Sequence, residues 1–274
     1  MPIFGFDQPP TSLLEFAPWM FGLLVFLWMF FRPWWAYMHT RILPQPEIEV
    51  IDWQNYPLPA VFRERIERDG QQLQALGFVP TYAYLSHIVA GPSELVTFSY
   101  LRPNSNLSAG IAANLVGSAG GFIVTEMFTM LASRFESGGR TALQTSNQDM
   151  VIDLGLRTRD ITHSFPHISK IGQLLELHEI LENRHFLNTD KHANEVHTSA
   201  DEFRRHIERR YQEIIEAWQT TQKIEPLPGG NGHRFRLSTM YKFLWSKGLP
   251  FGPILKWFRY QQSRRLEREL LCSG

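Results

Sequence analysis

The residues best suited to chemistry lie between positions 163 and 197, where six of the 10 histidines fall. His178, Glu182 and His185 follow one another at spacings of four and three, which places them on one face of a helix. Two imidazoles and a carboxylate in such an array can bind one metal ion. These three residues are therefore a candidate metal site. The alternative interpretation is a polar helix face with surface histidines.

The metal motif is incomplete. A carboxylate-bridged di-iron site needs two E-x-x-H motifs and two further glutamates, and only Glu182–His185 has this form. The zinc-protease motif H-E-x-x-H is also absent, because Glu182 stands where the second histidine would be. We therefore keep metal-dependent chemistry in region 163–197 as an alternative and predict no cofactor.

Other catalytic signatures are missing from the sequence. It contains no G-x-S-x-G nucleophile elbow, no phosphate-binding P-loop and no G-x-G-x-x-G. The single cysteine, Cys272, excludes an intrachain disulfide and a cysteine-based metal site. A polar segment, 137–147, could bind a ligand, but an ordinary hairpin turn at Ser137-Gly138-Gly139 explains it equally well.

The amino-terminal segment predicts a membrane helix over about residues 13–31. Its 19 residues carry one charge, Glu15, and at 1.5 Å per residue they suit a hydrocarbon core of about 30 Å. The alternatives are a signal peptide, which would need basic residues before the apolar run, and an interfacial hairpin broken at Pro33. Interfacial aromatic residues are expected at both ends of the span. They are Trp19, Trp34, Trp35 and Tyr37.

The orientation of this helix follows from the basic residues near it. None precedes the span, and Arg32 and Arg41 follow it. Because basic residues collect on the cytoplasmic side, we expect the amino terminus outside and the main domain in the cytoplasm. The localisation predicted from the sequence is therefore a single-pass membrane protein.

The charge of the chain is balanced overall but unevenly distributed. Lys+Arg and Asp+Glu each number 27, so a globally basic nucleic-acid binder is excluded. Residues 233–274 nevertheless hold nine basic and two acidic residues, a net charge of +7, which leaves −7 for residues 42–232. The chain is thus divided into an acidic body and a basic carboxyl end.

Aromatic residues alternate with basic ones in this carboxyl end, a composition that suits an anionic membrane surface. The alternatives are packing of the aromatic residues in the core, a protein partner, and nucleic acid, of which nucleic acid is the least favoured. The residues predicted at the membrane interface are Lys256, Trp257, Phe258, Arg259, Arg264, Arg265 and Arg268.

The body alternates between strand and helix patterns. Residues 42–58 are predicted as an extended connector, and 59–76 as a helix beginning at a proline and ending at Gly77. Strands are predicted over 78–89, 94–102, 122–137 and 140–147, whereas 106–121 allows either a strand or a close-packed turn. Helices are predicted over 164–186, 199–218, 239–245 and 253–271, with a short strand over 233–238. The second of these helices begins with a capping box at Ser199.

These elements predict an α+β fold. It comprises a single amino-terminal transmembrane helix, an antiparallel sheet of four to five strands, helices packed on one face, and a basic amphipathic carboxyl-terminal helix. The expected divisions are 1–41 (membrane segment), 42–58 (connector), 59–232 (α+β domain) and 233–274 (basic aromatic segment).

The function that this organisation favours is that of a membrane-anchored, non-catalytic protein, such as an accessory subunit, assembly factor or adaptor of a membrane complex. Its expected partners are the lipid bilayer, an anionic lipid surface and other subunits of such a complex, and not nucleic acid. The alternative is a membrane-bound, metal-dependent enzyme that uses the histidine-rich region.

Overall fold

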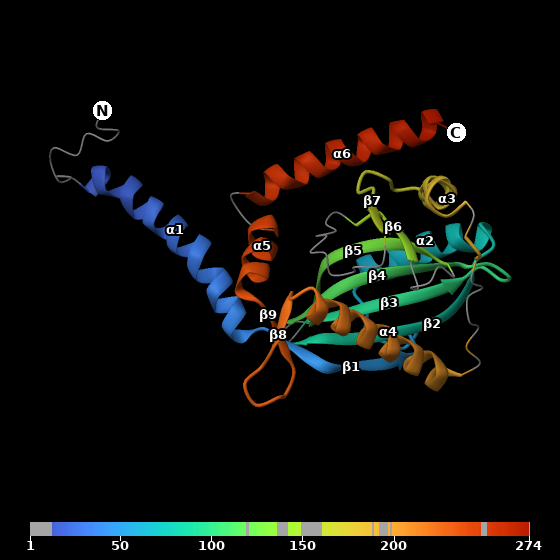
Figure 1. Cartoon of the computed structure of the whole chain (residues 1–274), viewed down its shortest axis with the longest axis horizontal. Coiled ribbons are helices and arrows are strands. Elements are labelled where there is room, and N and C mark those ends of the chain that lie inside the picture. The colour runs from blue at the N-terminus through green and yellow to red at the C-terminus, as the bar shows by residue number, and fades with distance from the viewer. Residues whose placement is uncertain are drawn as a thin grey trace.

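A computed structural model describes residues 13–91, 93–118, 121–135, 142–148, 161–187, 189–191, 197, 199–247 and 251–273. Within these ranges the chain forms six helices and nine strands (Figure 1). The helices are α1 (Leu13–His39), α2 (Ala60–Ala75), α3 (Ile171–Phe186), α4 (Ala200–Thr220), α5 (Leu237–Lys247) and α6 (Phe251–Ser273). The strands are β1 (Arg41–Ile51), β2 (Val79–Ala90), β3 (Ser93–Leu101), β4 (Leu107–Ser118), β5 (Gly121–Arg134), β6 (Ala142–Ser146), β7 (Ile161–Ser164), β8 (Ile224–Pro226) and β9 (His233–Phe235).

The strands form one sheet in the order β7-β6-β5-β4-β3-β2-β1-β9-β8. Neighbouring strands are antiparallel except β6 and β7, which are parallel. The predicted α+β class and the antiparallel run from β2 to β6 are confirmed. The predicted hairpin turn at Ser137-Gly138-Gly139 lies outside the described residues, as do residues 1–12 and 192–196.

The predicted size of the sheet was wrong, because the sequence patterns predicted no strand at β1, β7 or β8 and did not include the short strand at 233–238 in the sheet. Residues 41–51 form β1, although Pro44 and Pro46 favoured a connector; the register of β1 against β2 shifts between Ile42 and Glu47, where the prolines lie. The others, β7, β8 and β9, have four, three and three residues. A period-2 pattern is not recognisable over so few positions, and only β9 fell within a predicted strand.

Strand β4 resolves the segment that the sequence left open between strand and turn. It lies in the middle of the antiparallel run and pairs with β3 and β5 over most of its length. A Cβ atom at Gly110 would approach the Thr97 side chain to 3.4 Å. The small residues of this segment therefore allow close contact with neighbouring strands, which is a packing role rather than a turn.

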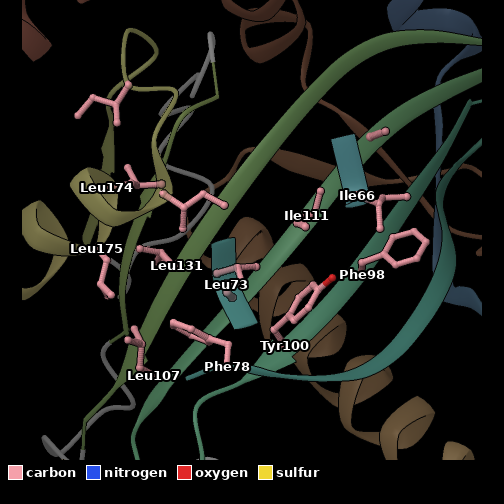
Figure 2. Packing of buried hydrophobic residues seen from close by; sticks show 14 of the residues in the cluster. Ile66, Leu73, Phe78, Phe98, Tyr100, Leu107, Ile111, Leu131, Leu174 and Leu175 are labelled. Atoms are coloured by element: carbon pink, nitrogen blue, oxygen red, sulfur yellow. The ribbon is translucent and has the colours of Figure 1, made fainter. Parts of the chain in front are cut away.

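The main core lies between the sheet, α2 and α3. Phe62 and Leu73 of α2 and Leu177 of α3 have no exposed surface. Figure 2 shows side chains of the sheet, α2 and α3 gathered in this one cluster. Burying each large apolar side chain contributes about 1.5–3 kcal/mol, so this layer supplies much of the stability that holds the body together.

The prediction that the helices pack on one face of the sheet was wrong. In β2, Ala83 and Leu85 belong to the main core, whereas the rings of Tyr82 and Tyr84 lie 4.8 and 5.3 Å from that of Phe203 in α4. Successive strand residues point to opposite faces, so α4 covers the face opposite α2. Both faces of β2 carry apolar or aromatic residues, and the sequence therefore did not mark either one as exposed.

Helix α4 has the start and the buried stripe predicted from the sequence. The Ser199 hydroxyl accepts a hydrogen bond from the Glu202 backbone N–H at 3.2 Å, which confirms the amino-terminal cap. The Tyr211 hydroxyl donates to the carbonyl oxygens of Leu43 and Ile88, and burial raises the pKa of this phenol. These contacts fix α4 across β1 and β2.

Helix α1 projects from the body beside β8 and β9, and α5 begins at the same place (Figure 1). Helix α5 stands beside the carboxyl-terminal part of α1. Helix α6 begins at the end of α5 that points away from β9, and then passes over β7 and α3, crosswise to α1. The predicted helices 239–245 and 253–271 are thus confirmed within longer ones.

Candidate membrane-facing site

Helix α1 is long and apolar enough to cross a membrane. The stretch Phe16–His39 meets the criteria of length and hydropathy with 6% of its apolar window buried, although a signal sequence satisfies the same criteria. Trp19, Trp34 and Trp35 are all exposed, at the positions where interfacial residues were expected. The helix does not end near residue 31 but continues through Pro33 to His39.

Tyr37, also predicted at the interface, holds α1 to the body. It is half-buried, and its hydroxyl donates to Glu225 Oε1 of β8 at 2.9 Å. The Arg234 guanidinium lies 4.2 Å from the centre of the Tyr37 ring and also donates to Glu225. Burial alone would raise the pKa of Glu225, but the hydrogen bonds from Tyr37 and Arg234 outweigh it and the pKa falls below its ordinary value.

A second attachment joins α1 to α5. Trp245 donates its indole N–H to the Met29 carbonyl oxygen at 2.9 Å, and the Tyr241 hydroxyl donates to the Phe30 carbonyl oxygen at 2.9 Å. The ring of Phe30 meets the ring of Trp245 edge-on at 5.9 Å. Sequence reasoning missed this contact, and the one available signal was the position of Pro33 four residues after Met29.

The carboxyl-terminal half of α6 is bound to the body. Leu270 has no exposed surface and belongs to the main core. Glu267 accepts a hydrogen bond from Gln173 at 2.7 Å and pairs with the imidazole of His167 at 2.6 Å. The Ser263 hydroxyl lies 3.1 Å from the other nitrogen of His167. This half of the helix therefore docks on α3 and on the segment that precedes it.

The amino-terminal half of α6 exposes its apolar side chains. Ile254 is 54% exposed, and Trp257 and Phe258 are each 57% exposed. The sequence-based alternative that Trp257 and Phe258 are core residues is therefore wrong. Lys256 is exposed on the same half, and Arg264, Arg265 and Arg268 are exposed one to three turns further along. The outward face of α6 thus changes from aromatic near α5 to basic toward its carboxyl end.

Arg259 does not belong to this outward face. It is half-buried, and its Nη1 atom is enclosed without a hydrogen-bond partner in the described structure. Its position in the helix places it with Leu255 and Ser263, on the side that faces the body. The prediction that Arg259 lies at the membrane interface is therefore not supported by its placement.

Two of the three candidate metal ligands lie together, but each is occupied by other groups. The His178 nitrogens Nε2 and Nδ1 lie 2.7 Å from the hydroxyls of Ser133 and Thr145. Ser133 donates to Glu182 Oε2 at 2.7 Å, and Lys191 pairs with the other oxygen of Glu182. Burial lowers the pKa of His178 to about 4, so its imidazole is neutral near pH 7.

The proton positions in this network follow from its geometry. Since the Ser133 proton goes to Glu182, the Ser133 oxygen accepts from His178 Nε2–H. Nδ1 of the neutral ring then accepts from Thr145. Both ring nitrogens of His178 and both carboxylate oxygens of Glu182 therefore have a partner, which is the arrangement of a satisfied buried network.

His185, the third candidate ligand, lies elsewhere. It is exposed, and its ring faces that of His163 at 5.8 Å. Among the residues that the structure describes, no group of three or more His, Cys, Asp or Glu side chains is placed to hold a metal ion. The spacing predicted a shared helix face, but the helix buries His178 and Glu182 and leaves His185 outside.

No protein-family model, curated protein or solved structure matches the chain significantly.

Proposed function

We propose that the protein is a membrane-anchored, non-catalytic accessory subunit, assembly factor or adaptor of a membrane protein complex. In this proposal α1 spans the membrane with the amino terminus outside, and the body lies on the cytoplasmic surface. The outward face of α6 (Ile254, Trp257, Phe258, Arg264, Arg265 and Arg268) docks the body on anionic lipid.

The observation that carries the proposal is the exposure of Trp257 and Phe258 on the half of α6 that follows α5, the helix bound to α1. Large exposed apolar side chains in a protein with a membrane-length helix favour insertion at the lipid boundary. Arg264, Arg265 and Arg268 follow on the same face, and each basic residue near an anionic leaflet adds about 1 kcal/mol.

The non-catalytic part of the proposal is supported by the sequence and by the His178 network. The sequence lacks the nucleophile and phosphate-binding motifs considered above. Both His178 nitrogens and both Glu182 oxygens already have partners, which gives the metal-enzyme alternative less support. Stoichiometric metal in the purified full chain, lost in both His178→Ala and His185→Ala, would overturn this part.

Topology is tested with sealed vesicles. Alkaline carbonate should leave the full chain in the membrane, and protease should digest the body only in inside-out vesicles. Release of the chain by carbonate would exclude a spanning helix. Digestion in right-side-out vesicles would reverse the orientation.

Docking is tested with an environment-sensitive fluorophore on the outward face of α6. The full chain carries Cys272→Ser and Gln261→Cys, because Cys272 is exposed and Gln261 lies between the aromatic and basic parts of that face. In nanodiscs of phosphatidylcholine and phosphatidylserine, spin-labelled lipid should quench the label at residue 261. Quenching should weaken in phosphatidylcholine alone.

The matched control label is Val79→Cys. Val79 is an apolar residue, 50% exposed, at the first position of β2. The last residue of that strand, Ala90, pairs with Arg41, which follows α1, so Val79 lies at the end of β2 that is far from α1. A label there should remain unquenched. Equal quenching at residues 79 and 261, or none at 261, would refute docking through α6.

Co-purification in a mild detergent tests the assignment to a complex. A stoichiometric set of membrane proteins should accompany the wild-type chain. Recovery of the chain alone, from native membranes, would contradict the adaptor role.

A further inference from the structure

The joint between α1 and α5 has a specific chemical cause in Pro33. In an α-helix, the carbonyl oxygen of residue 29 accepts a hydrogen bond from the N–H of residue 33. Proline has no N–H, so the Met29 carbonyl loses its partner within α1. In apolar surroundings an unpaired carbonyl is unfavourable, and membrane helices recover such groups through neighbouring side chains.

Helix α5 supplies a donor at this point. The Trp245 indole N–H lies 2.9 Å from the Met29 carbonyl oxygen, and the Tyr241 hydroxyl lies 2.9 Å from the next carbonyl, that of Phe30. Trp245 and Tyr241 are one helical turn apart, which matches two successive carbonyls on α1. Pro33 is buried, whereas every other side chain described in Phe16–His39 is exposed or half-buried.

The joint also determines where α6 begins. Only residues 248–250 separate α5 from α6, and a chain of that length reaches at most about 14 Å. Trp257 and Phe258 lie within the first two turns of α6. Holding α5 against α1 therefore keeps these rings near the bilayer that α1 enters, and away from any second membrane.

We propose that Trp245 is a positioning residue whose indole N–H replaces the hydrogen bond that Pro33 removes from α1, and that this joint aligns α6 with the membrane containing α1. The inference rests on the proposed membrane anchoring. It explains why α6 docks on the membrane that contains α1, and it predicts that Pro33 and Trp245 are energetically coupled.

The test is a double-mutant cycle on the full chain in anionic nanodiscs, read by quenching of the residue-261 label. Trp245→Phe keeps an aromatic ring but removes the donor, and should lower the ratio of docked to undocked α6 about two- to tenfold, the range of one net hydrogen bond. Pro33→Ala restores a backbone N–H for Met29. In the Pro33→Ala background, Trp245→Phe should therefore have little effect.

Trp218→Phe is the matched control. Trp218 is a buried indole of α4 whose N–H has no hydrogen-bond partner in the described structure, so this change removes the same atoms without removing a bond. It should leave quenching unchanged. An equal effect of Trp245→Phe in the wild-type and Pro33→Ala backgrounds, or no effect in either, would overturn the proposal, since the indole would then act by packing alone or not at all.

A second readout separates failure of the joint from failure of docking. Spin labels at Gly22→Cys and Gln261→Cys report the distance between α1 and α6 in detergent micelles, where α6 has no bilayer surface to dock on. A side chain at residue 22 meets nothing within 4 Å. The distance distribution should be narrow in the wild-type background and broaden with Trp245→Phe, whereas in the Pro33→Ala background the same change should leave the distribution unchanged. An equally broad distance distribution in the wild-type protein and in all of these variants would refute the α1–α5 joint. A narrow distribution in micelles, together with an unquenched residue-261 label in nanodiscs, would refute docking alone.

Discussion

The two halves of α6 meet very different surroundings. The carboxyl-terminal half buries Leu270 and gives partners to Glu267 and Ser263, whereas the amino-terminal half leaves Ile254, Trp257 and Phe258 exposed. One continuous helix thus packs against the protein core at one end and exposes its own apolar side chains at the other. The two halves thus differ in whether the body covers their apolar side chains, and the predictions below separate the two.

The largest expected effect is in the buried half. Leu270→Ala should lower the free energy of unfolding by about 2–5 kcal/mol, because it opens a cavity in the main core. The adjacent Leu271 is 45% exposed, and Leu271→Ala should change it by less than about 0.5 kcal/mol. Denaturant unfolding of the full chain in detergent measures both, and similar losses for the two variants would remove the distinction between the faces of α6.

The second prediction concerns acid stability of the interior beneath this half. The pKa of His178 is lowered to about 4 by burial, so below pH 6.5 the unfolded chain binds a proton that the folded chain does not. Stability should therefore decline as the pH falls from about 6.5 to 4, by a total on the order of 3 kcal/mol from this group.

His163, whose pKa burial also lowers to about 4, contributes to the same decline. His178→Gln should consequently reduce the slope of unfolding free energy against pH, although its stability at pH 7 is lower. Equal slopes in the two proteins, measured by denaturant unfolding between pH 4 and 7, would show that the His178 ring is not kept neutral by the fold.

A smaller effect is expected from the polar attachment of α6. Glu267→Gln should cost about 1–2 kcal/mol of unfolding free energy, because Gln173 and His167 lose a charged acceptor at a site where Glu267 is 15% exposed. Glu269→Gln is the control. Its pair with Arg265 is surface-exposed and should contribute no more than about 0.5 kcal/mol. A larger loss at Glu269 than at Glu267 would contradict the docking of this half on α3.

The smallest effect on stability should come from the exposed half. Trp257→Ala combined with Phe258→Ala should change the unfolding free energy in detergent by less than about 0.5 kcal/mol, because both rings already lie outside the core. The same variant should lose the quenching of a label at residue 261 in anionic nanodiscs. A loss of several kcal/mol in detergent would instead identify the rings as core residues.

The sequence predicted the elements with strong periodicity and missed those that depend on distant partners. The 3.6-residue pattern and cap of α4 and the apolar run of α1 are local properties, and both were recognised. Strand β1 was missed because two prolines weakened its local signal, and it forms only because β2 and β9 pair with it.

The candidate site shows the same division. Exposed Trp257 and Phe258 were identified from composition, but the alternative of core packing was resolved only by the position of α6 on α3. Arg259 was predicted at the membrane interface, whereas the structure places it on the side of α6 that faces the body. The histidine spacing correctly predicted a helix. The hydroxyls of Ser133 and Thr145, which hydrogen-bond the two ring nitrogens of His178, come from two strands more than 30 residues away. No local pattern encodes such contacts.

The pairing of β1 with β9 has a consequence for biosynthesis. Ile42 pairs with His233, so about 190 residues must be made before this position on the outer edge of β1 has its partner. At 5–20 residues per second, translation of that stretch takes roughly 10–40 s. An unpaired strand edge invites aggregation, and proline, which cannot donate to a neighbouring strand, discourages it. Pro44 and Pro46 therefore make the edge of β1 a poorer template for pairing with another chain before the carboxyl-terminal strands are synthesised.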